Sequence, residues 1–289
     1  MPLLNDWGKV AVEKARKTIR GNAGLHMATR IVRNMVVVGP FQDLLLDYYR
    51  RKSKAAPATT NETSFFEPVD EAAAADSLKR LGFVGAINLK PDVAKSLHDW
   101  AESPSYQRVN PHAHNATIHD IGHNGTLIRI IRSYLGAEPI LHSSYVDWAK
   151  ASRDLPYDAV SDATMFHYDT PDFRSCSARF YLTEVDELAA PHTVIGATHG
   201  KKGLRDLLIP YIANDLAAQK YGDKLVTFTG PPGTGWLEDL SIIHRRAKAK
   251  KPRLTLSYNW VISRTPMTEN LPDASGKLQK GNGEPNPFA

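Results

Sequence analysis

Residues 253–262 read RLTLSYNWVI, and this stretch indicates the fold class of the chain. Its large apolar side chains stand at every second position: Leu254, Leu256, Tyr258, Trp260 and Ile262. Successive side chains of a β-strand point to opposite faces of the sheet. The period of two therefore predicts a strand with one face in a core.

Further segments upstream have the same character. They are short, rich in β-branched or aromatic residues, and bounded by Gly, Pro or Asp: Ile140–Trp148, Thr164–Tyr168, Ala178–Val185, His192–Ile195 and Leu225–Phe228. Many short strands, with one inserted helix expected at Gly203–Tyr221, predict a mainly β fold arranged as a two-layered sandwich or jelly roll.

The N-terminal part of the chain is expected to be helical. Amphipathic helices are predicted near Gly8–Ile19, Leu25–Val38 and Asp43–Arg51. Their apolar faces are expected to be buried against the protein itself, with attachment to a membrane surface as the alternative. Residues 52–69 are polar and show no period, so we interpret them as a linker or long loop.

A helix–strand–helix unit is predicted after the linker. The first helix covers Asp70–Leu81, and Gly82 stands where a left-handed residue commonly ends a helix. A short strand is expected at Phe83–Leu89. Pro91 then opens a second helix that runs through Glu102, because proline suits the first helical turn.

The pattern divides the chain into three regions. Residues 1–69 form a helical extension with a linker, and residues 70–263 form the β-rich domain with its flanking helices. Residues 264–289 contain four prolines and three glycines without a period, which predicts a covering loop or a disordered tail.

Composition argues against several classes of protein. Cys176 is the only cysteine, so no disulfide can form within one chain, and a reducing, cytoplasmic location is expected. Charged residues interrupt the start of the chain, and no apolar run reaches about 18 residues, so neither a signal peptide nor a membrane span is expected. The net charge of +5 favours anionic partners slightly and selects none of them, and the oligomeric state is left open.

The tripeptide His167-Tyr168-Asp169 is followed, 75 positions after the aspartate, by His244. Residues two apart in a strand share a face, so His167 and Asp169 can point at one metal ion. Two imidazoles and one carboxylate on one face of an octahedral Fe(II) leave three positions open, which suits oxygenase chemistry. The tripeptide alone is a weak signal, but the ordered set predicts a metal site, which we call the metal triad.

Four segments resemble the phytanoyl-CoA dioxygenase-like family of Fe(II)/2-oxoglutarate oxygenases. They read FHYDTPDFR at 166–174, FYLTEVD at 180–186, PHTVIGATH at 191–199 and GTGWLEDLSIIH at 233–244. The likeness extends over residues 76–262. It implies a double-stranded β-helix core of the jelly-roll, cupin-like type, and a non-haem iron enzyme that uses Fe(II), 2-oxoglutarate and O2.

The resemblance also implies where 2-oxoglutarate binds. Arg253-Leu254-Thr255 matches the family's R-x-S/T arrangement, in which the arginine meets the distal carboxylate. A guanidinium offers a planar two-point match to a carboxylate, and the hydroxyl of Thr255 lies on the same strand face. The remaining cations of this basic run are expected to be solvated: Arg245, Arg246, Lys248, Lys250 and Lys251.

The implied activity is that of a dioxygenase that hydroxylates, or otherwise oxidises, a small or medium organic metabolite and releases succinate and CO2. Asp169 favours hydroxylation over halogenation, because related halogenases carry a small residue at this position. The sequence does not identify the substrate. The expected partner is a small molecule, with no nucleic acid and no stable insertion into a membrane.

The evidence for a functional role is weaker for several other polar residues. A histidine-rich loop contributes His112, His114, His119 and His123, and it is expected to line the substrate mouth rather than bind a second metal. His192 and His199 are expected to be structural or to lie just behind the site. Arg174 and Tyr168 stand beside the metal triad and could contact the substrate.

Two alternative functions remain open. The first is a nucleic-acid demethylase of the AlkB type, but that family adds a second arginine six positions after the first, where this chain has Asn259. The second is a non-catalytic β-sandwich binding protein. The intact metal triad and Arg253 weigh against that reading.

Overall fold

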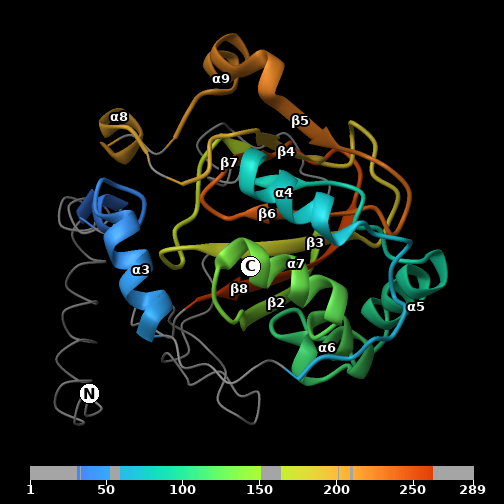
Figure 1. Cartoon of the computed structure of the whole chain (residues 1–289). Helices are drawn as coiled ribbons and strands as arrows, with labels where there is room; N and C mark the ends of the chain where they lie inside the picture. Colours follow the sequence, from blue (N-terminus) through green and yellow to red (C-terminus); the bar gives the residue numbers. More distant parts are fainter. Residues whose placement is uncertain are drawn as a thin grey trace, which may run out of the picture.

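The computed structural model describes residues 31–32, 34–52, 59–150, 164–200, 202–208 and 211–262 of the 289-residue chain. Two antiparallel sheets lie at its centre (Figure 1). The five-stranded sheet has the order β1 (Phe83–Val84), β6 (Gly235–Asp239), β3 (Ser175–Tyr181), β8 (Arg253–Val261) and β2 (Ile140–Ala149). The three-stranded sheet has the order β5 (Leu225–Phe228), β4 (His192–Ile195) and β7 (Ile243–Arg246). The predicted mainly β fold is thereby confirmed.

Strand β8 lies inside the larger sheet, paired with β3 on one side and β2 on the other. One face carries the alternating apolar residues that the sequence indicated, and all of them are fully buried: Leu254, Leu256, Tyr258, Trp260 and Ile262. The other face carries Arg253 and Thr255. One face of this strand is therefore apolar and the other polar, as the period of two predicted.

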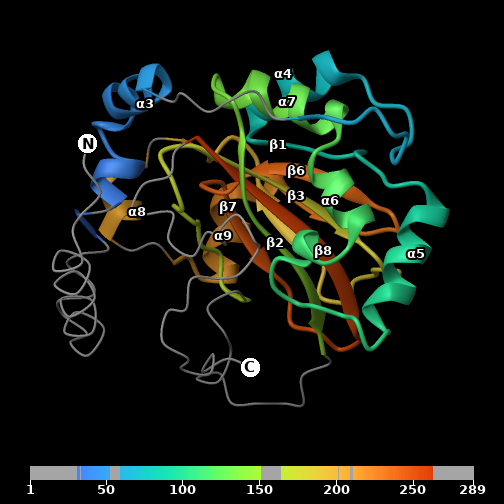
Figure 2. The same cartoon turned by 90° about the horizontal axis from the view of Figure 1, so that it is seen from below.

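Helices cover the apolar face of the five-stranded sheet (Figures 1 and 2). They are α4 (Glu71–Leu81), α5 (Pro91–Ala101), η1 (Pro111–Ala113), α6 (Ala116–Gly122) and α7 (Gly125–Leu135). Leu78 of α4 and Ile131 of α7 have no exposed surface and join the same cluster as β8. The helices α4 and α5 were predicted, whereas α6 and α7 were not.

The N-terminal region packs partly as expected. Residues 31–37 are helical where described, and α3 covers Gln42–Lys52. Val37, Val38 and Leu46 are buried, but Phe41 and Leu44 are 57% and 72% exposed, so the expected burial holds for only part of this surface. The helix predicted at Gly8–Ile19 and the tail at 264–289 lie outside the described residues.

The helix predicted at Gly203–Tyr221 is instead two helices, α8 (Leu204–Leu208) and α9 (Asn214–Tyr221), and η4 (Gly222–Lys224) follows. Between them, the N–H of Ile212 donates to the carbonyl of Phe166 at 2.9 Å. This bond across the fold takes the backbone of Ile212 out of a helical pattern. A tertiary contact thus overrides the local helix propensity.

Other predicted boundaries also changed. The strand expected at Phe83–Leu89 ends after Val84, because Ala86 adopts a positive φ of 59°. The segment Thr164–Tyr168 forms only isolated bridges rather than a strand. In the predicted linker, Phe65 and Phe66 belong to the core, while residues 53–58 lie outside the described part.

Among the described residues, no helix combines the length and the apolar character that a membrane crossing requires.

Gly82 ends α4 in the left-handed region, with φ 79°, and its N–H donates to the carbonyl of Leu78 at 3.0 Å. A Cβ at this position would lie 2.5 Å from Nδ1 of His199. We therefore expect Gly82→Ala to lower the free energy of unfolding by about 1–2 kcal/mol, as measured by urea denaturation. Gly222→Ala is the matched control, because Gly222 has φ −50° and its added Cβ meets nothing within 4 Å. An equal loss in both variants would contradict the explanation.

Candidate metal centre

The space between the two sheets is lined by polar and aromatic side chains. The helices cover the opposite face of the larger sheet, so the alternate residues point inward. On that sheet the inward residues are Ser177, Arg179 and Tyr181 of β3, Trp236 and Glu238 of β6, and Arg253, Thr255, Ser257 and Asn259 of β8. On the smaller sheet they include His192, Val194, His244 and Arg246.

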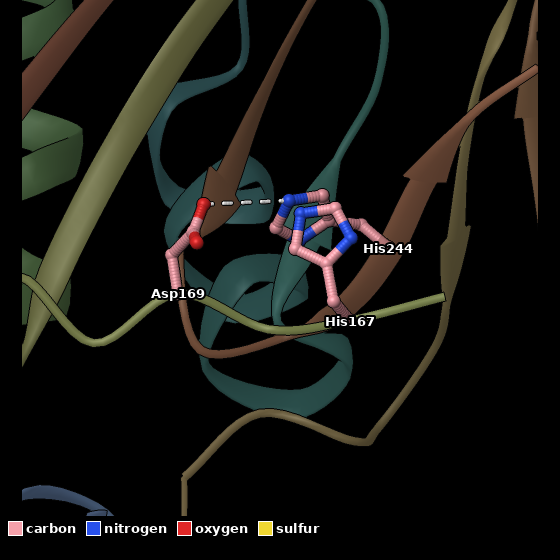
Figure 3. A group of neighbouring side chains, drawn as sticks. All are labelled: His167, Asp169 and His244. Carbon is pink, nitrogen blue, oxygen red and sulfur yellow. Dashed lines mark ion pairs between the residues drawn. The ribbon is translucent and has the colours of Figure 1, made fainter. Parts of the chain in front are cut away.

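The structure brings the metal triad together in this space (Figure 3). His167 and His244 form an antiparallel bridge, with N···O distances of 2.9 and 2.8 Å in the two directions. The N–H of Asp169 donates to the carbonyl of Leu240 at 2.9 Å. The ligand atoms of the metal triad all lie within 4.8 Å of one another. His244 was expected to end a strand, but it is the second residue of β7, because residues 240–242 form the turn before it.

Backbone hydrogen bonds fix both imidazole rings. The Nδ1 of His167 lies 2.8 Å from the carbonyl of Met165, and the Nδ1 of His244 lies 2.9 Å from that of Ile242. Since a carbonyl can only accept, each Nδ1 carries a proton, and each Nε2 is the ring nitrogen that remains for a metal. The Nε2 of His244 lies 3.6 Å from Oδ2 of Asp169. Two imidazoles oriented in this way and a carboxylate form a donor set that fits a divalent metal with open positions.

The site is buried on one side and open on the other. The side chain of His244 is 5% exposed, whereas that of Asp169 is 52% exposed. Burial lowers the pKa of His167, and the neighbouring His244 lowers it further. The ring of His167 is therefore neutral at pH 7, as a metal ligand must be.

Asn34, from the N-terminal region, holds both neighbours of Asp169. Its Nδ2 donates to the hydroxyl of Tyr168 at 3.1 Å, and its Oδ1 accepts from the hydroxyl of Thr170 at 3.3 Å. Asn34 is only 2% exposed, and Tyr168 also donates to the carbonyl of Asp206. Tyr168 is thus a buried structural residue rather than a substrate contact. Asn34 was missed in the sequence analysis, because it stands more than 130 positions before its partners.

A buried ionic cluster lies behind the metal triad. Glu238 has no exposed surface, and its carboxylate accepts from Nε of Arg179 at 2.6 Å, from Nε2 of His192 at 2.8 Å and from Nε1 of Trp236 at 3.0 Å. Burial alone would raise the pKa of Glu238, but His192 and Arg179 hold it well below its usual range. Burial lowers the pKa of His192 to about 4, so its neutral ring donates to the ionised carboxylate.

His192 also touches the metal triad. Its ring stacks on that of His244, with centroids 5.3 Å apart, and on that of Trp236 at the same separation. The expectation that His192 is structural, or lies just behind the site, agrees with this placement. The stacked ring of His192 helps to hold the ring of His244 in place.

Arg253 begins β8 and is buried, with 7% exposure. Its Nη1 donates to the carbonyl of Ala190, and its guanidinium lies 5.6 Å from the ring centre of Tyr181. Neither its Nε nor the buried Oγ1 of Thr255 has a hydrogen-bond partner among the described residues. Burial lowers the pKa of Arg253 to about 10, and Arg246 contributes to the lowering. A buried cation beside an unpaired hydroxyl fits the distal carboxylate of a 2-oxo diacid.

The basic run after His244 is not uniformly solvated, which corrects one expectation. Arg246 faces the interior and is half-buried, and Arg245 lies over the ring of Phe166 at 4.9 Å. The register of β7 explains this, because Arg246 shares a face with His244. Lys248, Lys250 and Lys251 are exposed, as expected.

The remaining candidates contact other parts of the fold. His112 contacts Ser144 at 2.7 Å, and the ring of His119 on α6 stacks 4.3 Å from that of His123, which follows the helix, so this segment is partly helical rather than a loop. Across the described ranges, the metal triad is the one group of three or more potential ligands. His199 contacts the carbonyl of Lys79 at 3.1 Å. Arg174 lies 5.4 Å from the ring centre of Tyr134.

Comparisons with known proteins bear on the fold. No family model matches the sequence, and no curated protein matches it. The crystal structure of EctD from S. alaskensis in its apo form is similar over 72% of this chain and 82% of that one, with a TM-score of 0.50 and 18% identity. SnoN, a non-heme alpha ketoglutarate dependent epimerase from nogalamycin biosynthesis, is similar over 75% and 96%, with a TM-score of 0.50 and 14% identity. The likeness confirms the predicted jelly-roll fold.

The position of Asn34 leads to a test of metal binding. Asn34→Ala removes the partner of both residues that flank Asp169, so we expect affinity for Mn(II) to fall about tenfold, the lower range for loss of an outer partner. Titration of the metal-free protein would measure this. Gln42→Ala is the matched control, because Gln42 is also buried but donates to Phe173, four positions past Asp169. If both variants lose affinity equally, general loosening of the N-terminal region is the cause.

Proposed function

We propose that this chain is an Fe(II)- and 2-oxoglutarate-dependent dioxygenase that oxidises, most simply by hydroxylation, a small or medium organic metabolite. The observation that carries the proposal is the pairing of two features in one interior. The metal triad offers two oriented imidazoles and a carboxylate, and the buried Arg253 and Thr255 keep polar atoms unpaired nearby. SnoN, which shares the fold, is described as a non-heme enzyme that depends on the same co-substrate.

In this proposal the metal triad holds Fe(II) through the Nε2 atoms of both histidines and the carboxylate of Asp169. Bound iron supplies the chemistry that couples O2 to the conversion of 2-oxoglutarate into succinate and CO2 and to oxidation of the substrate. Met165 and Ile242 keep the rings oriented through their carbonyls. We expect the substrate to approach from the exposed side of Asp169, whose side chain is 52% exposed.

Arg253 and Thr255 bind the distal carboxylate of 2-oxoglutarate. The guanidinium sits in a buried environment, where a charge-assisted hydrogen bond is stronger than in water. Because Nη1 is already held by Ala190 and the group rests on Tyr181, the arginine is fixed in place before the co-substrate arrives. This preorganisation limits the entropy lost on binding.

The nucleic-acid demethylase reading receives no support from this interior. Asn259, which stands where an AlkB-type protein carries its second arginine, donates to the hydroxyl of Ser143 at 3.1 Å. That hydrogen bond from the side-chain amide joins β8 to β2 and so stabilises the pairing of these two strands. A small-molecule substrate therefore remains the better proposal. We also propose that the protein is located in the cytoplasm.

Succinate formation in air tests the activity. Purified protein supplied with a panel of small metabolites should form succinate only when Fe(II) and 2-oxoglutarate are both present. His167→Ala and His244→Ala should each abolish it, since each removes one of three ligands, while the unfolding midpoint shows that the fold survives. Lys250→Gln, an exposed change in the same basic run, is the control. Undiminished succinate from either histidine variant would refute the assignment.

Arg253→Leu separates the two parts of the site. The guanidinium meets only the distal carboxylate, so the 2-oxoglutarate requirement should rise while the Fe(II) requirement stays nearly constant. Loss of a hydrogen bond to a charged group costs about 1.5–3 kcal/mol, or about 10- to 100-fold in affinity. Half-saturating concentrations measured by succinate release report both values. Unchanged affinity for 2-oxoglutarate would mean that its partner lies elsewhere.

A further inference from the structure

Arg246 faces the same interior as Arg253 but comes from the opposite sheet. It stands two positions after His244 on β7, so the two side chains share a face about 7 Å apart along the strand. Its register partner on β4 is His192, whose ring stacks on that of His244. Arg246 is therefore the next inward side chain along β7 from a residue of the metal triad.

Backbone contacts bring Arg253 to this same point. The carbonyl of Pro191 accepts from the N–H of Ala247, next to Arg246, at 3.1 Å, and the carbonyl of the preceding Ala190 accepts from Nη1 of Arg253. Two adjacent residues of one segment thus hold the backbone beside Arg246 and the guanidinium of Arg253. Arg246 also lies close enough to affect the charge equilibrium of Arg253.

The acids that face this interior are already engaged. Glu238 accepts from Arg179, and Asp147 on β2 pairs with Arg108, while its charge also raises the pKa of both Arg246 and Arg253 from a greater distance. Within the described ranges, neither Arg246 nor Arg253 forms an ion pair with a carboxylate. The buried Arg253 and the half-buried Arg246 repel each other, and an anion placed between them would relieve this cost.

We propose that Arg246 is a second binding residue for the distal carboxylate of 2-oxoglutarate, which it shares with Arg253. The inference rests on the proposed function. A carboxylate has two oxygens and about four acceptor sites, so it can accept from two guanidiniums and from the hydroxyl of Thr255 together. A 2-oxoglutarate held at the metal triad would present its far carboxylate to Arg246 of one sheet and Arg253 of the other.

Equilibrium binding tests this without turnover. Isothermal titration under anaerobic conditions, with Mn(II) in place of iron, gives the dissociation constant of 2-oxoglutarate for the intact protein and for Arg246→Gln. We expect binding to weaken about 10- to 100-fold in the variant, as for loss of one charge-assisted hydrogen bond. Arg246→Lys, which keeps the charge but loses the planar fork, should recover part of the loss. Lys250→Gln removes an exposed positive charge from the same run and should bind normally.

A second ligand shows where Arg246 acts. 2-Oxobutyrate has the same chelating end but no distal carboxylate, so Arg246→Gln should leave its affinity unchanged. Equal weakening of both ligands would overturn the inference, because it would place the defect at the metal triad. Unfolding midpoints without ligand verify that each variant is folded.

The outcomes also separate this inference from the proposed function. If Arg253→Leu weakens 2-oxoglutarate binding and neither Arg246 variant does, Arg246 is not a binding residue and the proposed function stands. If the intact protein with Mn(II) does not bind 2-oxoglutarate, the proposed function fails and the inference fails with it.

Discussion

The carboxylate of Glu238 joins the two sheets, and the geometry of the interior depends on it. It is fully buried on β6, and it binds Arg179 of the same sheet and His192 of the smaller sheet. Burying a charge costs several kcal/mol, so such a group persists only when partners satisfy it. Here the bond to His192 also sets the ring that stacks on His244. The cluster thereby connects sheet packing to the orientation of a metal ligand.

The two faces of the larger sheet carry separate tasks. One face meets the helices and supplies the apolar cluster that stabilises the fold. The other is charged and faces the smaller sheet, where Arg253 and Thr255 keep polar atoms unpaired among the described residues. Polar groups buried in this way cost stability unless a ligand meets them. The apolar packing of the opposite face of the sheet offsets this loss of stability.

Much of the fold and of the site could be predicted from the chain. The alternation in residues 253–262 defined β8 and the face that joins the core, because a strand's period of two is local. Spacing placed His167 and Asp169 on one side, and the structure brings His244 to them. The end of helix α4 could be located from Gly82, which caps it through a local hydrogen bond, and the structure adds Asp70 as the cap at its start. The boundaries of helices and strands were predicted less accurately, since contacts such as that between Ile212 and Phe166 are made across the fold.

The sequence by itself predicted the class of fold from short-range periodicity, and together with the resemblance to an oxygenase family it predicted the metal triad and the candidate residues for 2-oxoglutarate. Only the tertiary structure decided which remote groups surround them. Asn34 clamps the neighbours of Asp169 from more than 130 positions away, and Arg246, in a run that looked solvated, turns inward with His244. The physical reason is that burial and pairing are properties of the packed sheets, and the linear pattern of charges does not contain them.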